Sequence, residues 1–254
     1  MTAADQPRSG AQAVDRAIHV LNCFEGDDPE LSVSELAHRA GLPVSTTYRL
    51  AQALVRGRLL EQDPATDRYR IGHGLASLAR PALSRLGIDA AAPHLYALAA
   101  GIKITVSLSI ADDRDAVTVF QARPPVYFCP NQLPQARQPL RSSAVGQALL
   151  AFSPVVDGLD RRPAPLMDLD RVRRSGFAVE LIEREDPVRS VAVPVLGPDK
   201  QVWGALGVQA RSARLNEELV RGIVPAMRQI AGRIGPLFQS TAAITDAPVE
   251  LYSP

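Results

Sequence analysis

The sequence predicts an α+β protein in which two domains are joined by a helix. Its 254 residues exceed the common size of one domain, and with 46% hydrophobic and 22% charged residues each half can form its own core. Apolar residues recur at helical spacing early in the chain, whereas β-rich runs are mixed with helical segments later. We expect a loose N-terminus at 1–10, a first domain at 11–73, a linker helix at 74–88, a second domain at 89–240 and a tail at 241–254.

The first domain begins with an expected helix from Ala13 to Phe24, where apolar residues recur every third or fourth position. The Gly-Asp-Asp-Pro run at 26–29 ends this helix through backbone freedom and the proline ring. A short second helix follows Ser32. The hydroxyl of Ser32 can cap that helix while Glu35, three residues later, bonds back to the Ser32 N–H, as in a capping box. Gly41 can then turn the chain through positive φ, and Leu42 fills the turn.

A third helix is expected from Pro43, whose missing N–H costs nothing in a first helical turn, to Gly57. Its expected inward positions are Tyr48, Leu50, Leu54 and Val55. Two short strands, Leu59–Gln62 and Arg68–Ile71, then flank turn residues at 63–67.

Helix, helix, turn, helix and hairpin is the order of a winged helix-turn-helix domain. The apolar segment from Leu75 to Leu86 that follows is the expected linker helix, which Pro81 must bend or begin.

The second domain is expected to mix strands and helices in the manner of an α+β sensor domain. Strands are indicated at Ile104–Ile110 and Ala116–Phe120, and again at Val191–Leu196 and Val202–Val208 around a Gly-Pro-Asp-Lys turn. A helix of small residues is expected at Ser143–Phe152. An amphipathic helix over Asn216–Phe238, capped by Asn216, closes the domain.

The clearest functional signal is a local excess of positive charge around the third helix. Four arginines and no acidic residue lie between positions 39 and 58, although the net charge of the whole chain is only +1. Phosphate contacts are local, so this bias favours DNA binding. The hydroxylated helix start lets the backbone approach a groove, and Arg68 and Arg70 share a strand parity that suits a wing. The predicted DNA-binding residues are Arg39, Pro43, Val44, Ser45, Thr46, Thr47, Tyr48, Arg49, Arg56, Arg68 and Arg70.

Several sequence blocks resemble the IclR family of bacterial regulators. In the first half these are VDRA at 14–17, ELA at 35–37, GLP at 41–43 and YRIG at 69–72. In the second half, PLRSSAVGQALLA at 139–151 is similar to the family element PLHxTAxGKALLA. SGFAV at 175–179 and VRSVAVPV at 188–195 are similar to its GYAV and VRCVAAPV elements. The blocks follow the order of the family over nearly the whole chain.

The resemblance implies a GAF-like second domain that binds a small metabolite, often one with a carboxylate or an aromatic group. It also implies a homodimer or tetramer that binds double-stranded operator DNA as a repressor or activator. Matching the motifs places the effector site at Ser143, Ala144, Val145, Glu180, Ser190, Gly207 and Gln209. N–H groups at the helix start favour an anion, Glu180 could accept a hydrogen bond from a ligand hydroxyl, and Ser190 could donate one.

This chain departs from the family pattern at several matched positions. Val44 replaces a lysine of the helix-turn-helix, and Arg141 and Gln147 replace a histidine and a lysine. Gly207 and Gln209 stand where small hydroxylated residues are frequent. The stretch between Phe152 and Gly176 is also shorter than usual, so we expect a reshaped pocket wall and do not carry the identity of the effector over from the family.

Two other classes of function compete with a regulator. A reductase built on a GAF-like domain would need a pair of reactive thiols, but Cys23 and Cys129 fall in different domains. No GxSxG motif is present, and all four histidines precede residue 95, which disfavours a hydrolase. A winged-helix module that binds protein instead of DNA is the third possibility. We expect no cofactor, no metal site, no membrane segment and a cytoplasmic location.

Overall fold

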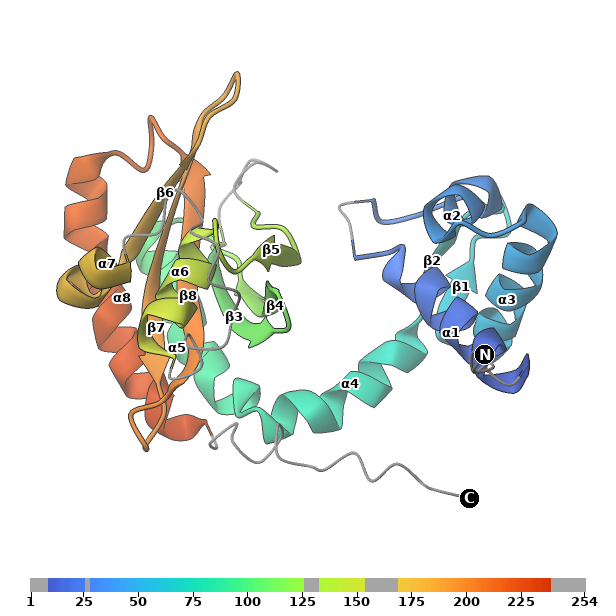
Figure 1. Cartoon of the computed structure of the whole chain (residues 1–254), viewed down its shortest axis with the longest axis horizontal. Coiled ribbons are helices and arrows are strands. Elements are labelled where there is room, and N and C mark those ends of the chain that lie inside the picture. Colours follow the sequence, from blue (N-terminus) through green and yellow to red (C-terminus); the bar gives the residue numbers. More distant parts are fainter. Residues whose placement is uncertain (1–8, 26–27, 126–132, 154–168, 239–254) are drawn as a thin grey trace, which may run out of the picture. The chain divides into compact units, whose positions relative to one another are not determined.

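The computed structural model describes residues 9–25, 28–125, 133–153 and 169–238, which divide between Ala82 and Leu83 into two compact units (Figure 1). The N-terminal unit has the predicted order of three helices and a hairpin. Its elements are α1 (Ser9–Asn22), α2 (Val33–Ala40), α3 (Val44–Arg56), β1 (Leu60–Gln62), β2 (Tyr69–Ile71) and the start of α4 (His73–Arg85). Ser9 and Gly10 are helical, although we expect them to be loose. Residues 1–8 and the expected tail at 241–254 lie outside the described residues.

The caps predicted from the sequence are present at α2. The Glu35 N–H donates to the Ser32 hydroxyl over 3.3 Å, and the Ser32 N–H donates to the Glu35 carboxylate over 2.7 Å. Gly41 follows the helix with φ of 63°, in the left-handed region. These bonds satisfy groups that a helix end leaves without partners, so the turn before α3 is determined locally.

The core of the N-terminal unit corrects the orientation expected for α3. Thr47, Ala51 and Leu54 face inward at positions i, i+4 and i+7, whereas Tyr48, an expected inward residue, is 50% exposed. Helices and hairpin close over a cluster of buried side chains. Its members are Val20, Leu31, Leu36, Ala51, Leu54, Leu60 and Tyr69.

The C-terminal unit is built on one antiparallel sheet with the strand order β5-β4-β3-β8-β7-β6. The strands are β3 (Val106–Asp112), β4 (Asp115–Ala122), β5 (Arg137–Pro139), β6 (Ala178–Ile182), β7 (Val188–Leu196) and β8 (Val202–Arg211). The helices are α5 (Ile88–Ile102), α6 (Ala144–Phe152), α7 (Leu169–Ser175) and α8 (Glu217–Ile234), followed by a 3₁₀ turn at Gly235–Leu237. This arrangement confirms the α+β class.

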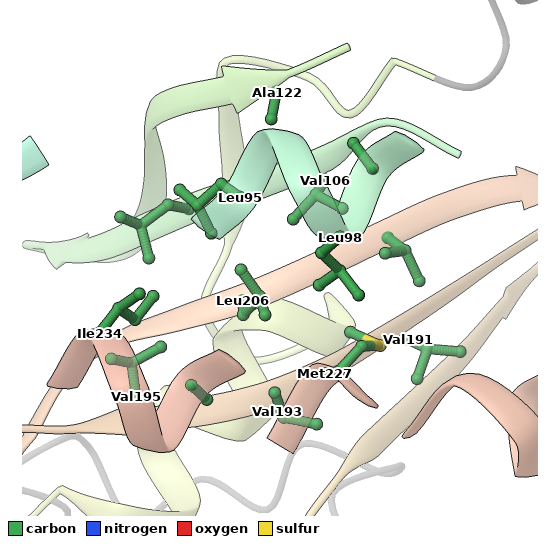
Figure 2. Close-up of a cluster of buried hydrophobic side chains, with 14 of the residues drawn as sticks. Leu95, Leu98, Val106, Ala122, Val191, Val193, Val195, Leu206, Met227 and Ile234 are labelled. Carbon is green, nitrogen blue, oxygen red and sulfur yellow. The ribbon is translucent and has the colours of Figure 1, made fainter. Parts of the chain in front are cut away.

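The two faces of the sheet carry different cores because side chains alternate along each strand. Val191, Val193 and Val195 of β7 point to the face covered by α5 and α8, where Leu95, Leu206 and Met227 join them (Figure 2). Ala192 points to the opposite face, where the small residues of α6 pack. The alanines and glycines of that second face bring α6 close to the strands that carry the predicted effector residues.

Candidate DNA-reading surface and ligand-binding face

Helix α3 presents an exposed face at the end of the helix-turn-helix. Val44 is 51% and Tyr48 is 50% exposed, and Ser45, Arg49 and Arg56 are exposed as well. Thr46 is half-buried. Along this face runs a cleft of about 680 Å³ between α1 and α3. The predicted residues Thr46, Tyr48, Arg49 and Arg56 therefore come together on one surface.

Arg16 of α1 lines the same cleft, and sequence reasoning missed it as a candidate contact. A signal was available because Arg16 lies in the VDRA block, one turn before the buried Val20. With Arg16, Arg49 and Arg56, the cleft has three guanidinium groups and no acidic residue among its lining side chains. Such a surface attracts phosphate.

The predicted arginines divide into two electrostatic classes. In the part of the chain that the structure describes, neither Arg49 nor Arg56 has a carboxylate within ion-pair distance. Arg39 instead pairs with Asp28. In the hairpin, Arg68 pairs with Glu35 at 2.8 Å and Arg70 pairs with Glu61 at 3.1 Å. Among the predicted DNA-binding arginines, Arg49 and Arg56 of α3 are therefore the two without a carboxylate partner in the described residues.

The start of α3 differs in one respect from the prediction. The side chain of Thr47 is fully buried, and its hydroxyl donates to the Pro43 carbonyl over 3.1 Å. Thr47 therefore stabilises the helix start from inside the domain and presents no group to a ligand. Pro43 is the N-cap residue and lies just before the first helical turn.

Glu61 connects the hairpin to the helix that leaves the N-terminal unit. Its carboxylate accepts hydrogen bonds from the His73 backbone N–H at 3.2 Å and contacts the His73 Nδ1 at 2.8 Å. These contacts and Arg70 lower the pKa of Glu61 to about 2. The carboxylate thus caps the N-terminus of α4, so the wing and the linker helix are joined by one charged group.

In the C-terminal unit, three predicted effector residues form one row across the sheet. Glu180 of β6 pairs with Ser190 of β7, and Ser190 pairs with Gln209 of β8. Directly opposed residues of antiparallel strands project from the same face, so the three side chains share the α6 face. Ser190 is 3% exposed and Gln209 is 7% exposed.

The next row explains Gly207, which pairs with Ala192. A Cβ atom at Gly207 would lie 2.7 Å from the Cγ1 atom of Val145 and 2.9 Å from the Ser107 hydroxyl. Glycine at this position therefore lets α6 approach the sheet. Its role is to bring the start of α6 over the polar row.

The start of α6 is occupied by protein groups. The Ser143 hydroxyl accepts from the Gly146 N–H over 3.1 Å, and the Glu180 carboxylate accepts from the Ala144 N–H over 3.0 Å. Burial raises the pKa of Glu180, and the Ala144 hydrogen bond opposes this shift in part. The predicted residues Ser143, Ala144, Val145 and Glu180 thus meet at one place, where a carboxylate already lies on the helix end.

Five further buried polar residues of this unit, Thr105, Ser107, Ser109, Gln138 and Gln147, are not among the predicted effector residues. The Nε2 atom of Gln147 donates to the Ser142 carbonyl over 3.1 Å. Among the described residues, the Thr105 hydroxyl and the Gln138 amide nitrogen are buried without a partner. Gln138 pairs with Ala116, a member of the α6-side core, so its amide faces that side of the sheet. Buried donors without partners are uncommon and mark a place where a ligand can bond.

The described residues give no support to other kinds of site. They contain no group of three His, Cys, Asp or Glu side chains that could hold a metal ion. None of their helices has the length and apolar character needed to cross a membrane. Cys23 is a half-buried free thiol whose pKa is raised by burial, and Cys129 lies outside the described residues.

Comparison with known proteins gives matches to both units. The profile of the IclR helix-turn-helix domain matches residues 13–64, and that of the bacterial transcriptional regulator IclR C-terminal domain matches residues 81–235. The chain is 26% identical over 223 residues to the HTH-type transcriptional regulator XynR of Escherichia coli K12, covering 81% of this chain and 88% of that protein. It is 26% identical over 246 residues to the DNA-binding transcriptional repressor YiaJ of the same strain, covering 89% and 87%.

Solved structures show the same architecture. A putative IclR regulator from Silicibacter sp. TM1040 has a TM-score of 0.64 at 29% identity and covers 90% of this chain and 100% of its own. An IclR homologue from Microbacterium hydrocarbonoxydans, crystallised with 4-hydroxybenzoate, has a TM-score of 0.70 at 22% identity and covers 89% and 98%.

Proposed function

The chain belongs to the IclR family of bacterial transcriptional regulators, and we propose that it reads operator DNA with the exposed face of α3. It is a DNA-binding regulator whose C-terminal domain binds a small-molecule effector. The observation that carries the α3 assignment is the pair Arg49 and Arg56, which line a cleft without acidic residues and lack carboxylate partners among the described residues. Unpaired guanidinium groups can bond phosphates or guanine edges without first breaking an ion pair.

In this proposal, the start of α3 approaches the groove with Val44, Ser45, Thr46 and Tyr48. Phosphate or base edges are contacted by the arginines of the cleft, Arg16, Arg49 and Arg56. Arg68 and Arg70 contact the backbone as a wing and exchange exposed carboxylate partners for phosphate oxygens. Such exposed pairs contribute little, so the exchange is easy. Arg39, which is held by Asp28, makes a peripheral contact at most.

The experiment is operator binding by Arg49→Ala, with DNA fragments identified by sequencing what the protein retains from its own genome. We expect the affinity for the operator to fall about tenfold. If the contact is to phosphate, the plot of log affinity against log salt should also become shallower, its negative slope losing about one unit of magnitude. Arg80→Ala removes the same charge from α4, which does not line the cleft, and should change both quantities less. Wild-type affinity with an unchanged salt slope in Arg49→Ala would refute the assignment.

We further propose that the effector lies between the start of α6 and the row Glu180, Ser190 and Gln209. The Ser190 hydroxyl and the Val145 N–H near the helix start can donate to it, and Glu180 can accept from a ligand hydroxyl. The neighbour crystallised with 4-hydroxybenzoate supports an aromatic ligand with a hydroxyl group. Because Glu180 already accepts from the Ala144 N–H, a ligand carboxylate must compete with it there.

The proposed assembly is a homodimer or tetramer that acts in the cytoplasm by binding and not by catalysis. Val14 and Ile18 of α1 are 58% and 48% exposed, and Leu78 of α4 is 65% exposed. Helix α4 has no buried residue, which is unusual for a helix with three leucines. A second copy would cover these side chains and place two α3 helices on a palindromic operator.

A further inference from the structure

A second cleft, of about 410 Å³, opens in the C-terminal unit and shares no lining residue with the row of Glu180, Ser190 and Gln209. It lies where the end of α6, helix α7, the end of β7 and helix α8 meet. Its lining includes three arginines, Arg173, Arg174 and Arg228, and the apolar side chains of Phe152, Pro194 and Leu196.

The strand lengths explain why this place is open. Pairing of β6 with β7 ends at Ala178 and Ala192, but β7 continues to Leu196. Pro194 and Leu196 therefore form an edge that no strand covers on the β6 side. Gly176, with φ of 70°, turns the chain from α7 into β6 at the rim of the cleft.

The turn at Gly176 also makes room for a guanidinium group. A Cβ atom at Gly176 would lie 2.6 Å from the Nη2 atom of Arg228, so a larger residue would displace this arginine. The guanidinium carbon of Arg228 lies 5.8 Å from the centre of the Phe177 ring, which supports it from one side. The arginine is thus held at the cleft although it lies in the middle of α8.

The charge in the cleft is not balanced by the described residues. Arg173 donates to the Ala151 carbonyl over 2.7 Å and pairs with Asp170 at 2.8 Å, so its charge already has a carboxylate partner. Within the described ranges, neither Arg174 nor Arg228 has a carboxylate partner. Favourable interaction with the α7 helix dipole accounts for Arg174, which lies in its last turn, but not for Arg228.

We propose that this cleft is a second ligand site, which binds a small organic anion with a compact apolar body. Guanidinium groups match the geometry of carboxylates and phosphate monoesters, and the apolar side chains can cover a ring or a short alkyl chain. The volume is that of a metabolite site. The site does not depend on the effector residues at α6.

The test titrates the full-length protein with 4-fluorophenyl phosphate, 4-fluorobenzoate and the neutral 4-fluorobenzyl alcohol, followed by ¹⁹F NMR of the ligand. Because the hydroxyl of the alcohol can also donate to Glu180 at the α6 site, binding to this cleft is the part that Arg174→Gln or Arg228→Gln removes. We expect such binding for at least one anion, and about tenfold weaker or no such binding for the alcohol. Arg174→Gln and Arg228→Gln should each weaken anion binding about tenfold, and Arg228→Lys should weaken it less. Arg233→Gln, on the same helix but outside the lining, should leave it unchanged.

Three results would overturn the proposal: no anion binding at millimolar concentration, alcohol binding that the Gln variants weaken as much as anion binding, or wild-type anion binding by both Gln variants. Circular dichroism and thermal unfolding confirm that each variant is folded. If Arg228→Gln does not fold, Arg228→Lys, which keeps the positive charge, takes its place in the test. Which anion binds better distinguishes a carboxylate ligand from a phosphate ester.

Discussion

Glu180 places a negative charge where the start of α6 attracts anions. Its carboxylate accepts from the Ala144 N–H over 3.0 Å and is half-buried beside Ser190. Burial raises the pKa of Glu180, so the carboxylate takes up a proton more readily than an exposed one. An effector that brings a second carboxylate to this helix end meets like charge, whereas a hydroxyl can donate to Glu180.

We therefore predict that Glu180→Gln shifts selectivity toward carboxylate ligands. The measure is the ratio of the affinities for 4-hydroxybenzoate and neutral 4-hydroxybenzamide, determined by calorimetry at neutral pH. Removing the charge should raise this ratio about tenfold, since one pKa unit of interaction corresponds to about 1.4 kcal/mol.

The pH dependence has a defined sign. Protonation of Glu180 removes the same negative charge as the Glu180→Gln substitution. In the wild type, the ratio of the affinities for 4-hydroxybenzoate and 4-hydroxybenzamide should therefore rise as the pH falls toward the raised pKa of Glu180. In Glu180→Gln the ratio should stay flat over that range. Glu183→Gln, an exposed residue after β6, is the matched control. A ratio that Glu180→Gln leaves unchanged contradicts the proposed competition.

Side-chain direction along α3 shows what the sequence could not supply at this scale. Hydrophobicity favours Tyr48 inside and Thr47 outside, and the structure has the reverse. Thr47 can be buried because the Pro43 carbonyl accepts its hydroxyl hydrogen, which removes the cost of an unpaired polar group. That bond depends on tertiary packing, which a periodic pattern does not contain.

At the scale of elements, α6 depends on a close approach at its N-terminus. A Cβ atom at Gly146 would lie 2.2 Å from the Leu140 carbonyl oxygen, which is backbone and cannot move alone. We predict that Gly146→Ala lowers the free energy of unfolding by about 1–3 kcal/mol, measured by urea denaturation.

The same substitution elsewhere provides the control for α6. Gly222 lies in α8 with nothing within 4 Å of its added Cβ. Gly222→Ala should therefore raise stability by about 0.5–1 kcal/mol through helix propensity. Equal effects of the two variants would show that the contact with Leu140 is not limiting.

Elements with local signals could be predicted, and elements held by distant pairing could not. The capping box of Ser32, the turn at Gly41 and the hairpin of β1 and β2 need only neighbouring residues. The five-residue edge strand β6 and the three-residue edge strand β5 are specified by their partners β7 and β4. The Ala-rich helix α5 contains Pro93 and has a weak amphipathic pattern, so it was not expected from the sequence.

The effector row has the same limitation. The family resemblance places Glu180, Ser190 and Gln209 in the site, but only the register of β6, β7 and β8 puts them side by side. Thr105 and Gln138 belong to segments without a motif, so their buried polar atoms become visible only in the folded domain.

At the scale of the whole molecule, regulation requires that effector binding in one unit changes DNA binding in the other. The boundary between the compact units, at Ala82 and Leu83, falls within α4. The N-terminus of this helix is capped by Glu61 of the hairpin, and Leu83, near its other end, packs against the C-terminal core. Helix α4 is therefore the covalent route for a two-state coupling.

Leu78→Lys tests whether α4 also carries the assembly. Leu78 is 65% exposed, and a two-fold interface would bury it in both copies, so a charge there should weaken dimerisation about 100-fold or more.

Sedimentation velocity should show smaller species, and operator affinity should fall because two half-sites are no longer bound together. Calorimetry with 4-hydroxybenzoate as a probe should give the same result as for the wild type, since the proposed effector site at α6 lies in the other unit. Ser77→Lys, also exposed on α4, should keep the assembly intact. If Leu78→Lys retains the wild-type sedimentation and operator affinity, the copies must join through other surfaces, and coupling through α4 would have to act within one chain.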